Sequence, residues 1–415
     1  MFDYDKWQEI FDSLKRHKLR TFATALAVWW GIFMLVILLG AGNGLRNSAE
    51  RDFADDAINS LFVWTSRTSK PYKGYKAGRR IKFHNKDLKA VKTNVEGVEY
   101  MSGRYFPSSR YMTEYNGKAL NFRMRAVEPE YQKIEYSEMT KGRYINQVDM
   151  RQKRKVAIIG DIAKDKLFGA DKTALGEYVK INGTKFQIVG VFTDASSKRE
   201  REYIYMPLAT AQSVFDKEDR VHGMVITVTD ETVDGANAIA DNVRRELAAV
   251  NHFDPEDTQA VGIHNNIESY QEFKMIFSGF SFFIWFVGIG SIIAGVVGVS
   301  NIMLITVKDR TKEIGIRKAL GATPWSIVSM IMQESIFLTA IAGYLGLIMG
   351  FSIIYGVDYL MRTYEIDDLE FFYNPEVDFA SVMMALVFLI VCGTLAGLVP
   401  ALQAARVNPV VAMKS

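Results

Sequence analysis

The sequence predicts an α-helical membrane protein with four transmembrane helices and a large α+β extracytoplasmic domain inserted between helices one and two. Three observations predict this class. Four long stretches contain almost no charged residues, and each is long enough to cross a hydrocarbon core of ~30 Å. The segment between the first two stretches has the composition of a water-soluble domain. Lys and Arg gather at one end of the stretches, as the positive-inside rule requires of the cytoplasmic side.

Residues 1–20 are predicted to form an interfacial helix on the cytoplasmic leaflet. Apolar residues recur there at the i, i+3, i+4, i+7 spacing of one helix face, at Trp7, Ile10, Phe11 and Leu14, and basic residues follow. The partners expected at this helix are membrane lipids. Residues 21–42 are uncharged and predict transmembrane helix 1. A signal peptide has a shorter apolar region and a small-residue cleavage site, so we interpret this span as retained.

Residues 43–270 predict the extracytoplasmic α+β domain. Four-residue spacing of Leu45, Ala49, Phe53 and Ala57 favours continuation of the first helix beyond the span. Strands are predicted at 61–65, 80–83, 156–159, 178–181, 186–192, 203–206 and 224–228. Helices are predicted at 87–93, 162–168, 209–215 and 233–250. Asn182-Gly183 between two alternating runs predicts a hairpin turn.

Transmembrane helix 2 is predicted at 275–307, about 33 residues or roughly 50 Å of helix against a core of ~30 Å. Two interpretations remain open: part of the helix projects as a stiff rod, or the helix tilts or breaks at Gly288 or Gly290. A rod would carry movement between the outer domain and the cytosolic connector.

Transmembrane helices 3 and 4 are predicted at 327–354 and 380–402. The loop 357–378 between them is rich in Asp and Glu and holds a single basic residue, Arg362, so we place it outside. The tail 403–415 then lies inside, and both termini are cytoplasmic. This topology predicts a multi-pass protein of the inner (cytoplasmic) membrane.

A short amphipathic segment, 308–323, connects the second and third spans. Its cations outnumber its anions, Gly321 supplies a break, and Pro324 opens the next helix. A charged helix of about three turns has little core of its own, so it rests on lipid or on a partner. One interpretation is a connector that merely satisfies the positive-inside rule, and the other is a docking element for a cytosolic protein.

The connector and the span before it carry a family resemblance. Asn301-Ile302-Met303-Leu304, followed by Arg310-Thr311-Lys312-Glu313-Ile314-Gly315-Ile316-Arg317-Lys318-Ala319-Leu320-Gly321-Ala322, resembles the signature of FtsX-type ABC-transporter permeases, most closely their MacB-like branch. The resemblance implies a cytoplasmic coupling helix that docks on an ATPase. The implied coupling residues are Lys308, Arg310, Thr311, Glu313, Ile314, Gly315, Ile316, Arg317, Lys318 and Gly321. Arg317 and Lys318 would supply charged contacts, Ile314 and Ile316 an apolar key, and Glu313 a pair for a basic groove.

The outer domain resembles the periplasmic domain of MacB-like permeases. The matching pieces are 155–160, 167–169, 174–176, 179–183, 186–191 and 206–211. The resemblance implies two subdomains, one inserted into the other, with segments near 60–100 and 220–270 forming the membrane-proximal part. The tail 400–409 is similar to the usual ending of the family.

Small residues four positions apart recur in the predicted spans, at Ser291 and Gly295, Ala294 and Gly298, Gly346 and Gly350, and Gly393 and Gly397. Such pairs let helix backbones approach closely, either within the chain or between two copies. The pairs of the second span are our candidates for a dimer seam, together with Asn301, which is also a candidate helix cap. Glu334 lies within the third span, where a carboxylate is costly. Either it has a functional role, or it makes a structural hydrogen bond with Gln333 or the basic connector.

No catalytic or metal-binding pattern is visible. The five histidines have no metal-binding spacing, and the sequence contains no HExxH, GxSxG or GxxxxGK[ST]. The single cysteine, Cys392, lies in an apolar run, so no disulfide forms within the chain. The net charge of +3 gives no reason to expect a nucleic-acid partner. We therefore expect a non-catalytic subunit with no cofactor of its own, with ATP and Mg bound by the partner ATPase.

The resemblance implies a permease dimer, homo- or heterodimeric, working with two copies of a cytosolic ABC ATPase. The best-known exporters of the MacB-like branch carry their ATPase in the same chain, whereas this sequence opens on the interfacial helix, so we expect a separate ATPase subunit. The branch implies mechanotransmission that drives efflux of drugs, peptides or other extracytoplasmic cargo with a periplasmic adaptor and an outer-membrane channel. Other branches release lipoproteins or regulate cell-wall hydrolases, and a membrane-anchored ligand sensor is the alternative of another class.

Overall fold

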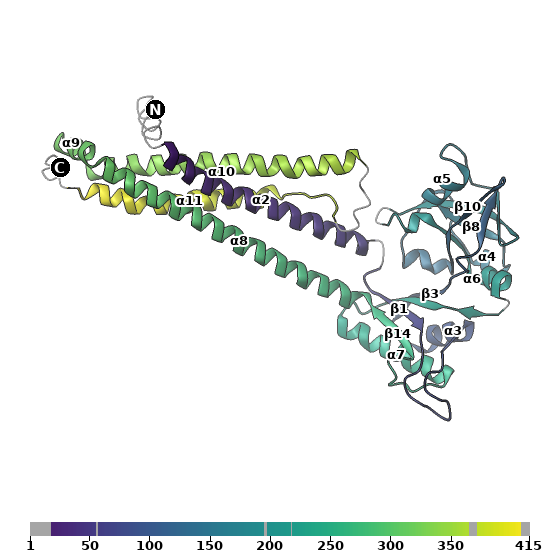
Figure 1. Ribbon diagram of the computed structural model, residues 1–415. Coiled ribbons are helices and arrows are strands. Elements are labelled where there is room, and N and C mark those ends of the chain that lie inside the picture. The colour runs from purple at the N-terminus through teal and green to yellow at the C-terminus, as the bar shows by residue number, and fades with distance from the viewer. Residues whose placement is uncertain (1–17, 55–56, 195–196, 217, 365–371, 408–415) are drawn as a thin grey trace. The chain divides into compact units, whose positions relative to one another are not determined.

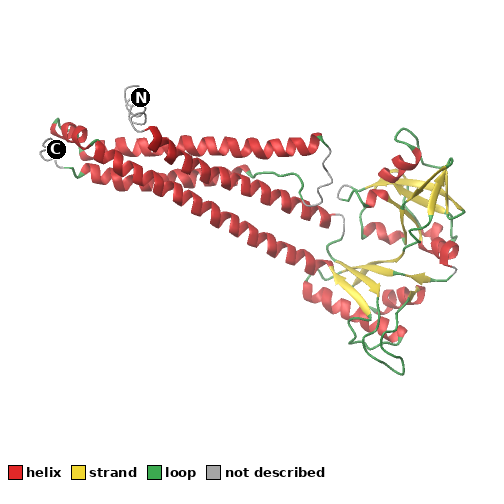
Figure 2. Cartoon of the chain, in the orientation of Figure 1, coloured by secondary structure: helices red, strands yellow, loops and turns green. Residues whose placement is uncertain are grey.

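The computed structural model describes residues 18–54, 57–194, 197–216, 218–364 and 372–407. The chain divides into two compact units, which we describe separately (Figures 1 and 2). The helical unit contains residues 1–49 and 275–415, and the sheet unit contains residues 50–274.

Four helices of the described residues are long and apolar enough to cross a membrane. They are α2 (Lys18–Ala54), α8 (Asn266–Asp309), α10 (Pro324–Thr363) and α11 (Phe379–Ala405), and the short helix α9 (Thr311–Ala319) connects α8 to α10 (Figure 1). The predicted fold class, four membrane helices with a large domain after the first, is confirmed.

Several helices extend beyond the apolar stretches that predicted them. Helix α2 continues through Leu45 and Ala49 to Ala54, as the apolar spacing predicted. Helix α8 starts at Asn266, nine residues before the predicted start at 275. The prediction missed this polar part because hydropathy marks only the part of a helix that lipid surrounds. Helix α10 runs to Thr363, into the segment predicted as a loop, where Asp358 and Arg362 form an i,i+4 ion pair of 2.9 Å. The predicted interfacial helix 1–20 lies almost wholly outside the described residues.

Glycines bring the helices of the helical unit into close contact. A Cβ atom at Gly346 of α10 would lie 2.5 Å from the carbonyl oxygen of Trp29 on α2. On α11, Cβ atoms at Gly393 and Gly397 would clash with Thr339 and Ser335 of α10. These small residues therefore serve packing within the chain, where they allow close backbone approach.

The sheet unit is built on one 12-stranded sheet with the order β14-β1-β13-β3-β6-β11-β8-β10-β9-β4-β5, and β7 pairs with β10. The strands are β1 (Ser60–Thr65), β3 (Val98–Tyr105), β4 (Met112–Tyr115), β5 (Lys118–Asn121), β6 (Arg123–Val127), β7 (Glu138–Gly142), β8 (Val156–Gly160), β9 (Tyr178–Ile181), β10 (Thr184–Thr193), β11 (Tyr203–Pro207), β13 (Gly223–Val228) and β14 (Val261–Asn265). Strands β2 (Phe83–His84) and β12 (Arg220–Val221) form a separate pair. The helices are α3 (Asn85–Asn94), α4 (Gln147–Arg151), α5 (Asp161–Phe168), α6 (Leu208–Ala211) and α7 (Val233–Asn251), with 3-10 turns η1 (Pro129–Lys133) and η2 (Glu200–Glu202) and a π turn η3 (Gln212–Asp216).

The strand order shows how the chain is arranged in this unit. Strands β14, β1, β13 and β3 come from its two ends, and the remaining strands of the large sheet come from its middle. The two groups join where β3 pairs with β6, through Arg104 opposite Val127 and Tyr105 opposite Ala126. The middle of the unit is thus inserted between strands formed by its outer segments.

Most predicted elements of the sheet unit are confirmed. The strands at 61–65, 156–159, 178–181, 186–192, 203–206 and 224–228 and the helices at 87–93, 162–168 and 233–250 are present. The Asn182-Gly183 turn joins β9 to β10, with φ of 46° and 82° as a type I′ turn requires. The strand predicted at 80–83 is wrong for most of its length, because Arg80 forms an isolated bridge with Arg67 and pairing resumes at Phe83. The helix predicted at 209–215 changes from α to π geometry at Gln212.

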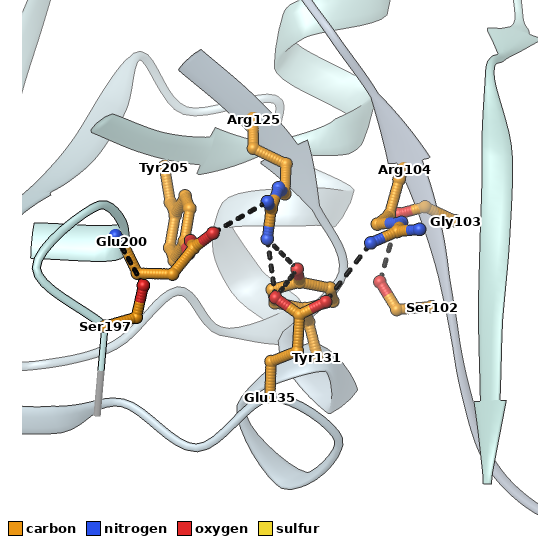
Figure 3. Close-up of polar contacts among 9 residues, drawn as sticks. All are labelled: Ser102, Gly103, Arg104, Arg125, Tyr131, Glu135, Ser197, Glu200 and Tyr205. Atoms are coloured by element: carbon orange, nitrogen blue, oxygen red, sulfur yellow. Dashed lines mark hydrogen bonds and ion pairs between the residues drawn. The ribbon is translucent and has the colours of Figure 1, made fainter. Parts of the chain in front are cut away.

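A buried network of charged and phenolic side chains lies near the junction of β3 and β6 (Figure 3). Arg125 of β6 donates to Glu135 at 2.5 Å and to Glu200 at 3.0 Å. Arg104 of β3 also donates to Glu135, at 3.1 Å. Burial raises the pKa of the Tyr131 phenol well above its usual value, so Tyr131 stays neutral and donates to Glu135. Each buried charge has a partner of opposite charge, which is the condition for keeping ions in a protein interior.

Candidate functional site

The connector between α8 and α10 is a separate short helix. The Thr311 hydroxyl, at the start of α9, donates to the carbonyl oxygens of Val307 at 3.1 Å and of Lys308 at 2.7 Å, the last turn of α8. Gly321 ends α9 with a φ of +98°, a value that favours glycine. Thr323 then caps α10, accepting from the Ser326 amide at 3.3 Å. Local sequence therefore sets both ends of the connector.

The apolar residues of the connector divide into a buried and an exposed set. Ile314 is 2% exposed and belongs to the same core cluster as Val307 and Ile327, and Gly315 is also buried. Ile316 is 45% exposed and Leu320 is 84% exposed. We expected Ile314 to contact an ATPase directly, and this is corrected: its side chain faces the helical unit because α9 rests on its own spans. Ile316 on α9 and Leu320 directly after it are the large apolar residues of the connector with exposed surface.

Four charged residues form ion pairs within the connector and between the connector and α10. Arg310 Nη1 lies 3.5 Å from the Oε2 atom of Glu334, and both side chains are largely buried. Arg310 Nε lies 3.7 Å from Glu313, and Arg317 donates to Glu313 at 3.1 Å. Glu334 therefore has the structural contact with a basic connector residue that was one of its two predicted roles.

Lys318 contacts the end of the fourth apolar helix. Its ammonium group donates to the carbonyl oxygens of Ala405 and Val407, at 2.7 Å each. A cation is favourable there because the last carbonyls of a helix have no partner in the helix and carry negative partial charge. We expected Lys318 to supply a charged partner contact, whereas the structure uses it within the chain. Lys308 and Lys312 are the exposed cations of the connector.

A groove of about 490 Å³ lies between α9 and the first turns of α10. Its lining residues are Arg310, Arg317, Leu320, Ala322, Thr323, Trp325, Ser326, Ile327, Ser329, Met330, Gln333 and Glu334. Trp325 is 75% exposed, and sequence reasoning did not select it. Its position directly after Pro324, at the start of a helix, was the available signal.

We name the exposed residues Lys308, Lys312, Ile316, Leu320 and Trp325 the connector surface. This surface offers both cations and apolar side chains, a combination that suits protein recognition.

The small residues of α8 also divide into two sets. Gly295 packs on α2, since a Cβ atom there would lie 3.1 Å from the Cα of Val28, and Ser291 approaches Gly31 of α2 through its backbone. Ala294 is exposed, and a Cβ atom at Gly298 would meet open space. Asn301 is exposed, and its side-chain amide makes no hydrogen bond to any part of the chain that the structure describes. Of the predicted seam residues, Gly295 is therefore used within the chain, whereas Ala294, Gly298 and Asn301 are accessible to a second copy.

The described residues contain no group of three or more His, Cys, Asp or Glu side chains that would hold a metal ion.

Two family models cover most of the chain. Residues 21–245 match the MacB-like periplasmic core domain, and residues 271–409 match the FtsX-like permease C-terminal region. Among curated relatives, the macrolide export ATP-binding/permease protein MacB of Bdellovibrio bacteriovorus is 26% identical over 411 residues, which cover 97% of this chain and 60% of that protein. The ABC transporter permease YvrN of Bacillus subtilis is 25% identical over 423 residues, which cover 97% of this chain and 98% of that protein.

The chain thus spans about 60% of the length of the MacB relatives that it matches. Among solved structures, the periplasmic region of MacB from Actinobacillus actinomycetemcomitans aligns with a TM-score of 0.42 at 14% identity, covering 54% of this chain and 96% of that one.

Proposed function

Because the chain belongs to the family of ABC-transporter permeases with a MacB-like periplasmic core domain and an FtsX-like C-terminal region, we propose that it couples ATP hydrolysis by an ATPase to movement outside the cytoplasm. In this proposal α9 and both termini lie in the cytosol, and the sheet unit lies outside. The distribution of Lys and Arg beside the spans supports that orientation in the cytoplasmic membrane.

The connector surface is the observation that carries the proposal. Leu320 is 84% exposed and Trp325 is 75% exposed, and they line the same groove. On the same connector, exposed Lys312 lies one helical turn from exposed Ile316. Exposed apolar side chains are poorly suited to water, whereas a protein partner buries the apolar groups and pairs the charge. We propose that an ATPase element enters this groove, with one ATPase copy bound to each of two permease chains.

Helix α8 supplies the proposed route from the connector. It is a single helix from Asn266, which directly follows β14, to Asp309, which directly precedes the turn into α9. Its 44 residues correspond to roughly 66 Å, more than twice the ~30 Å of a hydrocarbon core. A displacement of α9 is therefore proposed to reach the sheet unit along one continuous element.

The proposed cargo is an amphipathic drug, a peptide or another extracytoplasmic molecule. The support is macrolide export, the activity for which the MacB relatives are named. A periplasmic adaptor and an outer-membrane channel are proposed as further partners only from the resemblance of the sequence to the MacB-like branch.

The test begins with affinity purification of the tagged chain from membranes in a mild detergent and identification of the ATPase that co-purifies. Leu320→Glu places a charge in the proposed contact, so we expect loss of ATPase binding and of permease-stimulated ATP turnover. Tyr364→Glu is the matched control, because Tyr364 is 70% exposed at the far end of α10. ATPase binding that survives Leu320→Glu, or that both variants weaken equally, would contradict the proposal.

A further inference from the structure

The segment that follows β1 in the sheet unit has a strong positive charge. Residues 66–82, which we name the basic hairpin, contain seven Lys and Arg residues and no Asp or Glu: Arg67, Lys70, Lys73, Lys76, Arg79, Arg80 and Lys82. This charge is more than twice the net charge of +3 carried by the whole chain. The hairpin follows β1, which is drawn in purple in Figure 1.

The basic hairpin has a defined conformation. Its arms meet in isolated bridges between Arg67 and Arg80 and between Tyr72 and Tyr75, and Lys73-Gly74 forms the turn with φ of 44° and 88°. Asp257 holds one arm, accepting from the Ser69 amide at 2.6 Å and from the Ser69 hydroxyl at 2.7 Å. The cations are therefore presented on an ordered scaffold.

The charge of the hairpin is not neutralised within the described part of the chain. None of its seven cations forms an ion pair with a described carboxylate. Arg79 donates to the carbonyl oxygens of Asn251 at 2.7 Å and His252 at 2.8 Å. Lys73 lies 5.2 Å from the ring centroid of Tyr72. Concentrated like charge is unfavourable in the free protein, and an anionic partner would relieve that repulsion.

The base of the hairpin forms a site suited to carboxylates. Arg67 and Arg80 line a pocket of about 550 Å³ together with Thr65, Ser66, Thr258, Gln259 and Gly262. Both arginines are exposed. A guanidinium presents its donors as a planar fork that binds a carboxylate through two hydrogen bonds, and hydroxyl and amide groups add further donors.

The arrangement of the cations favours an extended acidic segment as the occupant. They lie along both arms and at the base, whereas a flat lipid surface would contact only the tip. Strands β1 and β14 are antiparallel, with Leu61 opposite Asn265 and Thr65 opposite Val261, so the hairpin and the start of α8 lie at opposite ends of this strand pair. Within the sheet unit, the hairpin therefore lies away from the first residue of α8. A second copy of the same hairpin is excluded as the partner because like charges repel.

We propose that the basic hairpin docks an acidic segment of a partner protein, with carboxylates bound by Arg67 and Arg80. The Tyr75 ring has the Arg79 guanidinium 4.4 Å from its centroid and stacks with His252 at 6.3 Å, and its remaining exposed part contacts the apolar parts of that segment. The site lies outside the connector and uses none of its residues, so its failure would leave the ATPase proposal untouched.

The test uses the full chain in an uncharged detergent and a fluorescently labelled oligoglutamate peptide. We expect the peptide to bind, and R67Q/R80Q to weaken its affinity roughly tenfold. R67K/R80K keeps the charge but loses the planar forks, so its affinity is expected between the two. R151Q/K155Q is the matched control, since it removes two exposed cations from the same unit, and we expect a change below about twofold.

Thermal unfolding checks that each variant is folded. Three outcomes would overturn the proposal: no binding of oligoglutamate by the unmodified chain, equal weakening by R67Q/R80Q and the control, or binding to phosphatidylglycerol vesicles without binding to the peptide. Complete displacement of the peptide by inorganic phosphate, measured at constant ionic strength, would also overturn the proposal. That result would indicate a site for small anions.

Discussion

Arg310, at the junction of α8 and α9, and Glu334, inside α10, form an ion pair of 3.5 Å in which both side chains are largely buried. They are 24 positions apart in sequence, and the pair joins the start of the connector to the helix that follows it. A carboxylate within an apolar helix is costly unless it has a partner. The pair therefore offsets the cost of burying the Glu334 carboxylate and attaches the start of α9 to α10.

Arg310→Met is expected to leave Glu334 buried without a counter-charge. Permease-stimulated ATP turnover should fall about fivefold or more, which corresponds to a coupling free energy of about 1 kcal/mol. The thermal unfolding temperature should also fall. The double variant Arg310→Met/Glu334→Met removes both charges and should recover the unfolding temperature but not the turnover. Recovery of both quantities would indicate a purely structural pair.

The Glu313–Arg317 pair allows intrahelical stabilisation to be separated from partner contact. Each single neutral variant, Glu313→Gln or Arg317→Gln, removes the 3.1 Å ion pair and should abolish stimulated ATP turnover while membrane insertion persists. Exchange of the two residues, Glu313→Arg with Arg317→Glu, keeps an i,i+4 pair on the helix but reverses the charges that a partner meets. We expect the exchanged variant to remain inactive in an ATP hydrolysis assay. Restored turnover would show that the pair serves the helix alone.

A second copy of the chain is expected to contact the exposed small residues of α8. In a Cys392→Ala background, Ala294→Cys should form a disulfide-linked dimer in native membranes on mild oxidation, because Ala294 is exposed and nearby Gly298 leaves space for a helix. Val299→Cys is the control, since Val299 is fully buried within its own chain. Gel electrophoresis without reductant distinguishes the two. Equal cross-linking of both variants, or of neither, would contradict a seam at this face.

The buried network of the sheet unit predicts a large effect on stability. Arg125→Met leaves Glu135 and Glu200 without their shared counter-charge, so the free energy of unfolding should fall by about 3–5 kcal/mol. A decrease of roughly 10 °C in the unfolding temperature is expected. Arg123→Met, on the same strand but exposed, should change it by less than about 2 °C. Differential scanning fluorimetry in detergent measures both variants.

Asp161 predicts a pH-dependent contribution to stability. Burial acts to raise the pKa of Asp161, but hydrogen bonds from Arg201 and Thr193 outweigh it, and the pKa is lowered overall. The ionised form is thus favoured in the folded state. This contribution is present above the unfolded pKa of about 3.9 and is lost as the pH falls through the lower folded value.

Asp161→Asn should therefore lower the unfolding temperature at pH 7, and the difference from the unmodified chain should shrink below about pH 4. Asp165→Asn, on the exposed side of the same helix, is the control and should have little effect at either pH. A difference for Asp161→Asn that stays constant with pH would contradict the assignment.

The helices and many strands could be predicted because their signals are local. Uncharged stretches predict the spans, and unbroken apolar runs such as 156–159 predict buried strands. Strands β3 and β6 were missed because Arg104 and Arg125 interrupt their apolar pattern. Those arginines form ion pairs with Glu135 and Glu200, whose proximity depends on the tertiary fold.

The connector residues could be predicted from the motif, but the face that each presents could not. Ile314 and Ile316 are two positions apart and chemically identical, yet Ile314 is buried in the core and Ile316 is exposed. Which side faces the spans depends on how α8 and α10 diverge, and the motif contains no information on that angle. For the same reason we predicted a partner contact for Lys318, although its ammonium group donates to a carbonyl oxygen at the end of α11.

Lys318 has a mechanical consequence. Helix α9 is covalently linked to α8 and α10, and the ammonium group of Lys318 adds a third attachment, to the carboxyl end of α11. A force applied to α9 therefore acts on three of the four long apolar helices, and α8 is the one of these three that continues directly from β14. Shortening the Lys318 side chain would remove the contact with α11 and leave the covalent links of α9 to α8 and α10 intact.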